Sequence, residues 1–255
     1  MQRISRRTAL IGLVLLPASA GSPAIAAAEQ FGVATDEGEM VLSRYAAEGA
    51  EKRPSVLLLH GARGIEMKPT AYERHAKALQ GAGIDCYLVR YLTEDDAHFL
   101  ANGTKQEREP YETARFDAWA KRISAAVSAV LARSEASGQI GLLGFSLGGY
   151  VAAASAARDA RVNALAVLYG GLPGAMVSEV KHLPPLLELH GEADTNVPLR
   201  EGERLVALAK GLGAEAEQVT YPGKKHGFDF SDADPATSDA IGRVTRFFEA
   251  HLSAG

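Results

Sequence analysis

The chain has 255 residues, of which 47% are hydrophobic and 23% are charged, and its formal net charge at pH 7 is −4. This length and hydrophobic content suit one large α/β domain with a substantial core. The slightly acidic balance argues against nucleic acid or an anionic membrane as a partner. The single cysteine, Cys86, excludes an intramolecular disulfide, and the apolar residues around it predict a buried thiol in a strand.

The beginning of the chain has the composition of an export signal. Three arginines precede a short apolar stretch at 9–16, and small residues then offer cleavage sites after Ala26 or Ala28. The adjacent Arg6 and Arg7 resemble a twin-arginine signal, and an ordinary secretory signal with two neighbouring arginines is the alternative. The apolar stretch is too short to span a bilayer, so no membrane anchor is expected.

We therefore expect residues 1–28 to be removed and residues 29–255 to form a single domain. The mature chain would lose three arginines and no acidic residues, which leaves 24 basic and 31 acidic residues and a net charge of −7. A periplasmic or secreted bacterial protein is the predicted location.

Beyond this signal, apolar runs of strand length alternate with amphipathic stretches of helix length. Continuous apolar runs are typical of strands that are covered on both faces. Strands are predicted at 41–45, 55–60, 84–90, 140–145, 164–169, 186–190 and 216–221. Helices are predicted at 71–80, 115–133, 147–158, 200–210 and 236–251. The alternation predicts an α/β fold with a mostly parallel central sheet, helices on both faces and an antiparallel edge strand at 41–45.

In such sheets, ligands bind beyond the carboxyl ends of the strands, and the first loop of this kind reads His60-Gly61-Ala62-Arg63-Gly64. We expect the backbone N–H of Ala62 to be one of the two donors that an oxyanion hole needs. The guanidinium of Arg63 could bind a substrate carboxylate. A solvated surface arginine is an equally good interpretation.

The segment 93–113 is polar and rich in acidic residues, and it contains Pro110. We expect a long loop here, and a loop of this length within a compact domain is usually functional or mobile. It is predicted to form one wall of a substrate pocket, with Phe99 and Tyr111 as contacts and His98 as a further candidate. A plain solvated connection is the alternative.

The most informative motif is Gly-Phe-Ser-Leu-Gly at 144–148, which follows an apolar strand and opens an alanine-rich helix. Strand, sharp turn and helix are the context of a nucleophile elbow, which presents a strained serine at its tip. Gly144 and Gly148 are needed where a Cβ would clash with the neighbouring strand and helix. Ser146 is therefore the candidate nucleophile, and the free N–H of Leu147 is the second expected oxyanion donor.

A serine hydroxyl needs a base to take its proton and an acid to orient that base. Asp194 follows the strand at 186–190, and Glu192 in the same turn is its competitor. His226 follows the strand at 216–221 in a glycine-containing loop, with a solvated loop histidine as the alternative interpretation. The order serine, acid, histidine is the one expected for a nucleophile elbow.

The other histidines are scattered along the chain, and no Cys-x-x-Cys or His-x-x-x-His pattern is present, so we expect neither a metal nor a cofactor. His190 is predicted to pack under the acid loop, and His60 to shape the oxyanion loop. His75 and His251 are predicted to lie on helix surfaces facing solvent, and His182 lies in a loop.

With these motifs the chain resembles the α/β-hydrolase superfamily, and in particular the dienelactone hydrolase family, over roughly residues 50–252. The resemblance rests on Leu-Leu-Leu-His-Gly, Gly-Phe-Ser-Leu-Gly-Gly, His-Gly-Glu-Ala-Asp-Thr-Asn-Val-Pro and Lys-His-Gly-Phe. It implies the α/β-hydrolase fold, triad roles for the matching residues and a preference for ester-like bonds in modest-sized substrates. Two departures are present: the family's nucleophilic cysteine is replaced by Ser146, and its glutamate before the oxyanion residue is replaced by Gly61.

The sequence thus predicts an exported serine hydrolase that cleaves ester-type bonds of a small molecule through an acyl-enzyme. A peptidase related to the prolyl oligopeptidases is one alternative. A non-catalytic α/β-hydrolase used as a binding module is another. The acyl group and the oligomeric state stay open.

Overall fold

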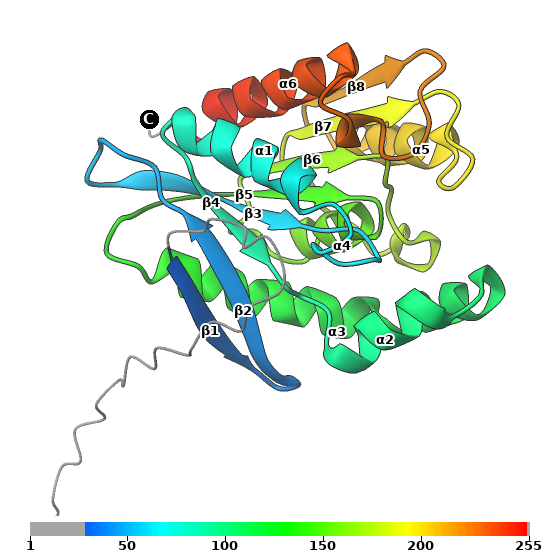
Figure 1. Ribbon diagram of the computed structural model, residues 1–255, viewed down its shortest axis with the longest axis horizontal. Helices are drawn as coiled ribbons and strands as arrows, with labels where there is room; N and C mark the ends of the chain where they lie inside the picture. The colour runs from blue at the N-terminus through cyan, green and yellow to red at the C-terminus, as the bar shows by residue number, and fades with distance from the viewer. Residues whose placement is uncertain (1–28, 254–255) are drawn as a thin grey trace, which may run out of the picture.

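The computed structural model describes residues 29–253 (Figure 1). The expected export signal at 1–28 lies outside the described residues.

An eight-stranded sheet lies at the centre of the described chain, in the spatial order β1-β2-β4-β3-β5-β6-β7-β8 (Figure 1). The strands are β1 (Glu29–Thr35), β2 (Gly38–Tyr45), β3 (Arg53–Leu59), β4 (Asp85–Val89), β5 (Ala136–Phe145), β6 (Ala164–Leu168), β7 (Leu186–Gly191) and β8 (Ala216–Tyr221). β2 pairs antiparallel with β1 and with β4. Every pair from β4–β3 to β7–β8 is parallel, which confirms the predicted fold class.

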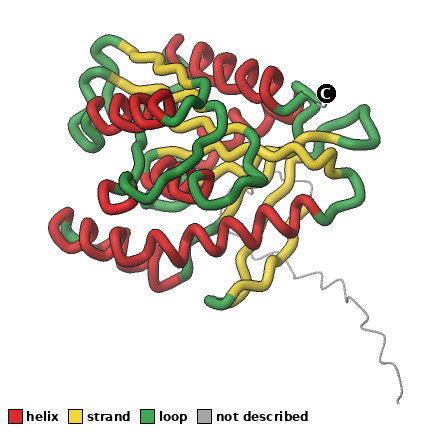
Figure 2. Tube along the Cα trace, turned by 180° about the vertical axis from the view of Figure 1, so that it is seen from behind, coloured by secondary structure: helices red, strands yellow, loops and turns green. Residues whose placement is uncertain are grey.

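Helices cover both faces of this sheet, as the views from the front and from behind show (Figures 1 and 2). They are α1 (Pro69–Gly81), α2 (Glu94–Asn102), α3 (Lys105–Leu131), α4 (Leu147–Ala156), α5 (Leu199–Gly211) and α6 (Pro235–His251), with the 3-10 turns η1 (Gly174–Met176) and η2 (Phe228–Phe230). Successive strand residues point to opposite faces, so Leu57 packs with Trp119 of α3 and Leu58 packs in the core that α1 and α6 cover. The apolar runs of the central strands follow from this double coverage.

The edge of the sheet differs from the prediction. The segment 41–45 belongs to β2, which has a neighbour on each side, and the edge strand is β1, which precedes it. Only alternate residues of β1 are withdrawn from solvent, as for a strand with one covered face, so it lacks the continuous apolar run by which the other strands are found.

The prediction of a loop at 93–113 is wrong. Residues 94–102 form α2, and α3 begins at Lys105 and continues through Pro110. Each helix opens with a capping box, in which Thr93 pairs with Asp96 and Thr104 pairs with Glu107. Four of the six acidic residues of this segment therefore lie in the first turns of the two helices, where negative charge is favourable; they are Glu94, Asp95, Asp96 and Glu107.

Two smaller features complete the fold. Cys86 is fully buried in β4, as predicted, and burial raises the pKa of its thiol. Within residues 29–253, no helix combines the length and the apolar composition that crossing a membrane would require.

Candidate active site

Ser146 lies at the tip of the turn between β5 and α4. Its backbone has φ 54° and ψ −119°, a positive-φ conformation that side chains rarely adopt. A Cβ on Gly144 would lie 2.2 Å from the carbonyl oxygen of Gly148, and one on Gly148 would lie 2.2 Å from the carbonyl oxygen of Leu59. Both glycines are thus required by close backbone approach, and the turn has the geometry of a nucleophile elbow.

Two loops at the carboxyl ends of β7 and β8 bring an acid and a histidine to this serine. His226 Nε2 lies 2.9 Å from Ser146 Oγ, and His226 Nδ1 lies 2.7 Å from Asp194 Oδ2. The other carboxylate oxygen of Asp194 accepts hydrogen bonds from the backbone N–H groups of Asn196 and Val197, at 2.8 and 3.0 Å. The three residues singled out from the sequence are therefore in contact in the order serine, histidine, aspartate.

The protonation of this group follows from its surroundings. Burial alone would raise the pKa of Asp194, but hydrogen bonds from His190, from His226 and from the N–H of Val197 hold it well below its usual range. Asp194 is therefore a carboxylate at neutral pH and can only accept. His226 must then donate from Nδ1, which leaves Nε2 free to accept the proton of Ser146.

The loop that follows β3 lies against Ser146. A Cβ on Gly61 would be 3.5 Å from the Cβ of Ser146. The N–H of Gly61 donates to the hydroxyl of Tyr72, and its carbonyl accepts from Gly64. Among the hydrogen bonds within residues 29–253, none uses the N–H of Ala62 or of Leu147. Their role as oxyanion donors stays a prediction.

His60 contacts this loop through its ring and is fixed through its backbone carbonyl, as predicted. Its ring stacks on Tyr91 at 4.7 Å, and its Nδ1 lies 2.8 Å from the carbonyl oxygen of Gly61. The hydroxyl of Tyr91 donates to the His60 carbonyl at 3.0 Å. Burial lowers the pKa of His60 to about 4, so its ring is neutral at physiological pH.

Four further residues were proposed to contact substrate: Phe99, Tyr111, Arg63 and His98. Phe99 and Tyr111 stack on each other at 4.1 Å, but the hydroxyl of Tyr111 donates to Asp96 and is thereby engaged. Arg63 and His98 are exposed to solvent. Among the contacts between described side chains, none links either of them to the triad, so their role in substrate binding stays a prediction.

The prediction for His75 is wrong, because this residue is buried. Its Nε2 lies 3.1 Å from Asp229 Oδ2, and the other oxygen of this fully buried carboxylate accepts from Tyr169 at 2.7 Å. The ring of Tyr169 lies 4.7 Å from that of His226. Neither Tyr169 nor Asp229 was singled out from the sequence, although a tyrosine directly after an apolar strand and before two glycines marks a loop at the ligand-binding edge.

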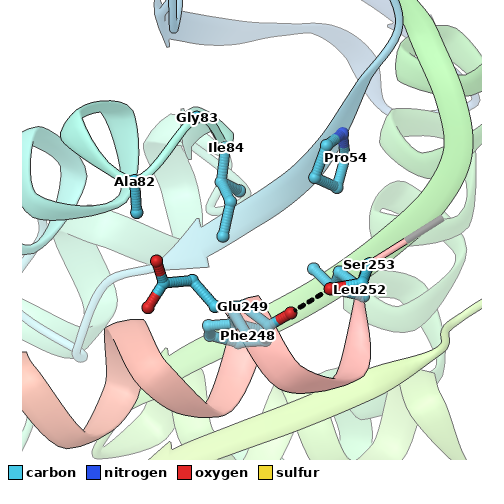
Figure 3. A pocket seen from close by; sticks show the side chains of 8 residues that line it. All are labelled: Pro54, Ala82, Gly83, Ile84, Phe248, Glu249, Leu252 and Ser253. Carbon is cyan, nitrogen blue, oxygen red and sulfur yellow. Dashed lines mark hydrogen bonds between the residues drawn. The ribbon is translucent and has the colours of Figure 1, made fainter. Parts of the chain in front are cut away.

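A hollow in the surface lies away from this site, between the start of β3, the turn before β4 and the end of α6 (Figure 3). It includes Pro54 near the amino end of β3, whereas Ser146 lies at the carboxyl end of β5. The hollow therefore lies at the amino ends of the parallel strands, opposite the ends at which Ser146 lies. Within residues 29–253, no group of three or more His, Cys, Asp or Glu residues is arranged to hold a metal ion.

Comparison with known proteins identifies a family. The profile of the "Dienelactone hydrolase family" matches residues 41–252. A protein from Yersinia pestis named "Putative carboxymethylenebutenolidase" is 28% identical over 126 residues, which cover 44% of this chain and 47% of the relative. The match thus spans about half the length of that curated relative.

Two solved structures share the fold. A dienelactone hydrolase from Anabaena variabilis is 21% identical, with a TM-score of 0.71, and the match covers 88% of this chain and 98% of that one. A hyperthermophilic esterase from Pyrobaculum calidifontis is 20% identical, with a TM-score of 0.67, and the match covers 87% and 82% of the two chains.

Proposed function

The chain belongs to the dienelactone hydrolase family, and we propose that it is an exported serine hydrolase that cleaves ester bonds of small substrates. Membership of this family makes it a hydrolase of the esterase type. The nucleophile, the acyl-enzyme route and the export are the parts that we propose.

In the proposed mechanism, Ser146 attacks the carbonyl carbon of an ester while His226 Nε2 takes its proton. Asp194 keeps His226 in the tautomer that accepts at Nε2 and stabilises the imidazolium that forms. The N–H groups of Leu147 and Ala62 donate to the developing oxyanion. His226 then returns its proton to the leaving alcohol, and water attacks the acyl-enzyme by the same steps in reverse.

One observation carries this proposal. His226 contacts Ser146 through one ring nitrogen and Asp194 through the other, at 2.9 and 2.7 Å, although the three residues come from three separate loops. Ser146 is also held at positive φ, which costs on the order of 1–3 kcal/mol and persists only where surrounding structure enforces it. A binding module needs neither feature.

The test is hydrolysis of p-nitrophenyl esters from acetate to palmitate by the mature protein and by Ser146→Ala. We expect kcat to fall by about 10⁴-fold or more, because the nucleophile is lost while the fold is kept. Ser128→Ala, which removes an exposed hydroxyl from α3, is the matched control and should retain full turnover. Ester hydrolysis by Ser146→Ala at the wild-type rate would contradict the assignment.

The proposed export is tested separately by fractionating cells that produce the full chain. We expect the protein outside the cytoplasm with an N-terminus after Ala26 or Ala28. The paired change Arg6→Lys and Arg7→Lys should block export by a twin-arginine route and leave an ordinary secretory route working. Full-length protein that stays in the cytoplasm would contradict export.

A further inference from the structure

A second histidine and a second carboxylate lie behind Asp194, inside β7. Glu188 and His190 both have 0% of their surface exposed. Ionisable side chains are almost never fully buried unless they are paired, because removing a charge from water is costly. The mechanism described above uses neither residue, so their presence in the core needs another explanation.

The ring of His190 faces acceptors through both of its nitrogens. Nδ1 lies 2.7 Å from Glu188 Oε1, and Nε2 lies 2.9 Å from the carbonyl oxygen of Val197. Nε2 is also 3.5 Å from Asp194 Oδ2, the same oxygen that holds His226. A carbonyl oxygen can only accept, so Nε2 carries a proton, and two carboxylates around the ring favour a second proton on Nδ1.

The position of Glu188 is built by neighbouring elements. Its Oε2 accepts a hydrogen bond from Gln218 Nε2 at 2.8 Å, across the register pair of β7 and β8. Helix α5 passes the carboxylate at Gly202, where a Cβ would lie 2.4 Å from the carboxyl group. Both carboxylate oxygens are thus engaged, and the helix leaves room for them by having no side chain at this point.

We propose that Glu188 and His190 form a buried carboxylate–imidazolium pair that positions Asp194 from behind and offsets part of the negative charge that Asp194 presents to His226. This inference rests on the proposed function, since Asp194 and His226 act together only as members of the triad. His190 is a positioning residue, because it contacts Asp194 and Val197 in the acid loop and no reacting atom.

The charges around the pair support this arrangement. Burial alone would lower the pKa of His190, but the hydrogen bonds to Asp194 and Glu188 raise it to about 10, so the ring stays charged through neutral pH. Two further groups act on Glu188, Glu203 of α5 and Tyr150 of α4, and the ring of Tyr169 lies 4.7 Å from that of His226. Burial raises the pKa of both tyrosines, which therefore stay neutral. Burial also raises the pKa of Glu188, against the hydrogen bonds to His190 and Gln218, which favour its carboxylate form.

The first experiment measures the pH dependence of kcat/KM in His190→Gln. A general base can take the proton of Ser146 only in its unprotonated form, so kcat/KM falls on the acid side of the pH profile. Without the imidazolium, the full negative charge of Asp194 acts on His226, and the acid limb should move up by about one pH unit.

The double variant Glu188→Gln, His190→Gln removes both charges and keeps the test valid where the single variant does not fold. It should also move the acid limb upward, but by less than His190→Gln, because the negative charge of Glu188 is removed together with the positive charge of His190. His251→Gln is the matched control, because His251 also lies near a carboxylate, at 3.7 Å from Glu215, and has no contact with the triad. An acid limb in the folded double variant that coincides with the wild-type limb overturns the proposal.

The second experiment observes the charge of His190 without any turnover. Nitrogen-15 NMR of Ser146→Ala should show one imidazole with both nitrogens protonated at pH 8, and His190→Gln in that background should remove this signal. A His190 ring with an unprotonated nitrogen at pH 8 overturns the proposal. Retained esterase activity in Ser146→Ala would instead contradict the proposed function, so the two failures are distinguishable.

Discussion

At the scale of single residues, the backbone at Ser146 shows how packing imposes an unfavourable conformation. Its N–H donates to the carbonyl oxygen of Leu168 at 3.0 Å, which ties the turn to β6. On the other side, Gly148 lets α4 approach the carbonyl oxygens of Leu59 and His60. The serine is therefore held between two strands, and its hydroxyl points to the loops that carry His226 and Asp194.

Gly148→Ala is predicted to destabilise the protein and to abolish most activity. The new Cβ would lie 2.2 and 2.5 Å from the carbonyl oxygens of Leu59 and His60, and these backbone atoms cannot move aside without displacing the end of β3 and the loop that follows it. We expect the free energy of unfolding to fall by about 2–4 kcal/mol. Urea denaturation gives the stability, and p-nitrophenyl acetate hydrolysis gives the activity.

Gly211→Ala is the matched control for this change. Gly211 is the last residue of α5, and a Cβ added there would meet no neighbouring atom within 4 Å. The variant should be as stable as the wild type or more stable by up to about 1 kcal/mol, since alanine is the better helix former. Equal stability and turnover in Gly148→Ala and Gly211→Ala would show that the close approach at the elbow imposes no constraint.

The residues of the candidate triad were predictable because local sequence marks them. Each follows a predicted strand and stands in a short motif containing glycine. His75 was misplaced, although it lies three residues after Tyr72 and four before Leu79 and so shares their buried helix face. Its polar character suggested solvent, and only the distant Asp229 explains its burial. Such a pairing depends on contacts between elements far apart in the chain, which no local pattern reports.

At the scale of the elements, α2 and the start of α3 show that composition is a weaker guide than position. The segment 93–113 is acidic and contains a proline, and both features suggested a loop. Threonine followed three residues later by an acid is, however, a helix-start signal, and it occurs twice, at Thr93 and Thr104. Pro110 removes one backbone donor from α3, a cost that packing of the long helix against the sheet offsets.

Asp96 joins these two helices, and Asp96→Asn is predicted to loosen them. Its fully buried carboxylate accepts from Arg115 at 2.7 Å, from Trp119 at 2.9 Å and from the N–H of Thr93 at 3.0 Å. An amide in its place would face these donors with its own N–H₂ group. We expect a loss of about 2–4 kcal/mol in the free energy of unfolding, measured by urea denaturation at pH 7.

The pH dependence of this loss has a definite sign. Burial alone would raise the pKa of Asp96, but its hydrogen bonds, led by Arg115, hold it far below the usual value of 3.8. Its stabilising effect is therefore complete above about pH 5 and declines as the pH falls below about 4. The difference in the free energy of unfolding between wild type and Asp96→Asn should narrow in that acid range.

Asp95→Asn, an exposed change in the same helical turn, is the control. It should lower the free energy of unfolding by less than about 0.5 kcal/mol at any pH. A loss equal to that of Asp96→Asn would refute the role of burial.

At the scale of the whole molecule, the site lies at the carboxyl ends of the parallel strands, whereas the core fills the two faces of the sheet. β3 has β4 on one side and β5 on the other, so the strand order reverses between β3 and β5. Loops leaving the carboxyl ends of neighbouring strands diverge at such a point and leave space for a ligand. The loop at His60 and the elbow at Ser146 lie there. The alternation of strands and helices was enough to predict that the site lies at the carboxyl ends of the strands. The same alternation did not predict the hairpin of β1 and β2 or the packing of α6 against the sheet.

Phe248→Ala tests whether a change in the core lowers stability without changing the activity of the site. The ring of Phe248 is fully buried against β5, where it occupies the space that a Cβ on Gly141 would need. Its removal should cost about 3–5 kcal/mol, because the cavity cannot refill from a strand that has no side chain there. The activity of each folded molecule should be unchanged, since Ser146 lies beyond the carboxyl end of that strand.

Phe247→Ala is the control, because it removes a half-buried ring that lies 4.7 Å from that of His251. It should lower the free energy of unfolding clearly less than Phe248→Ala. Denaturation curves and active-site titration with a fluorophosphonate separate the two effects, because the titration counts competent molecules independently of their stability. A fall in kcat per titrated site in Phe248→Ala would mean that the core beneath α6 also sets the geometry of the elbow.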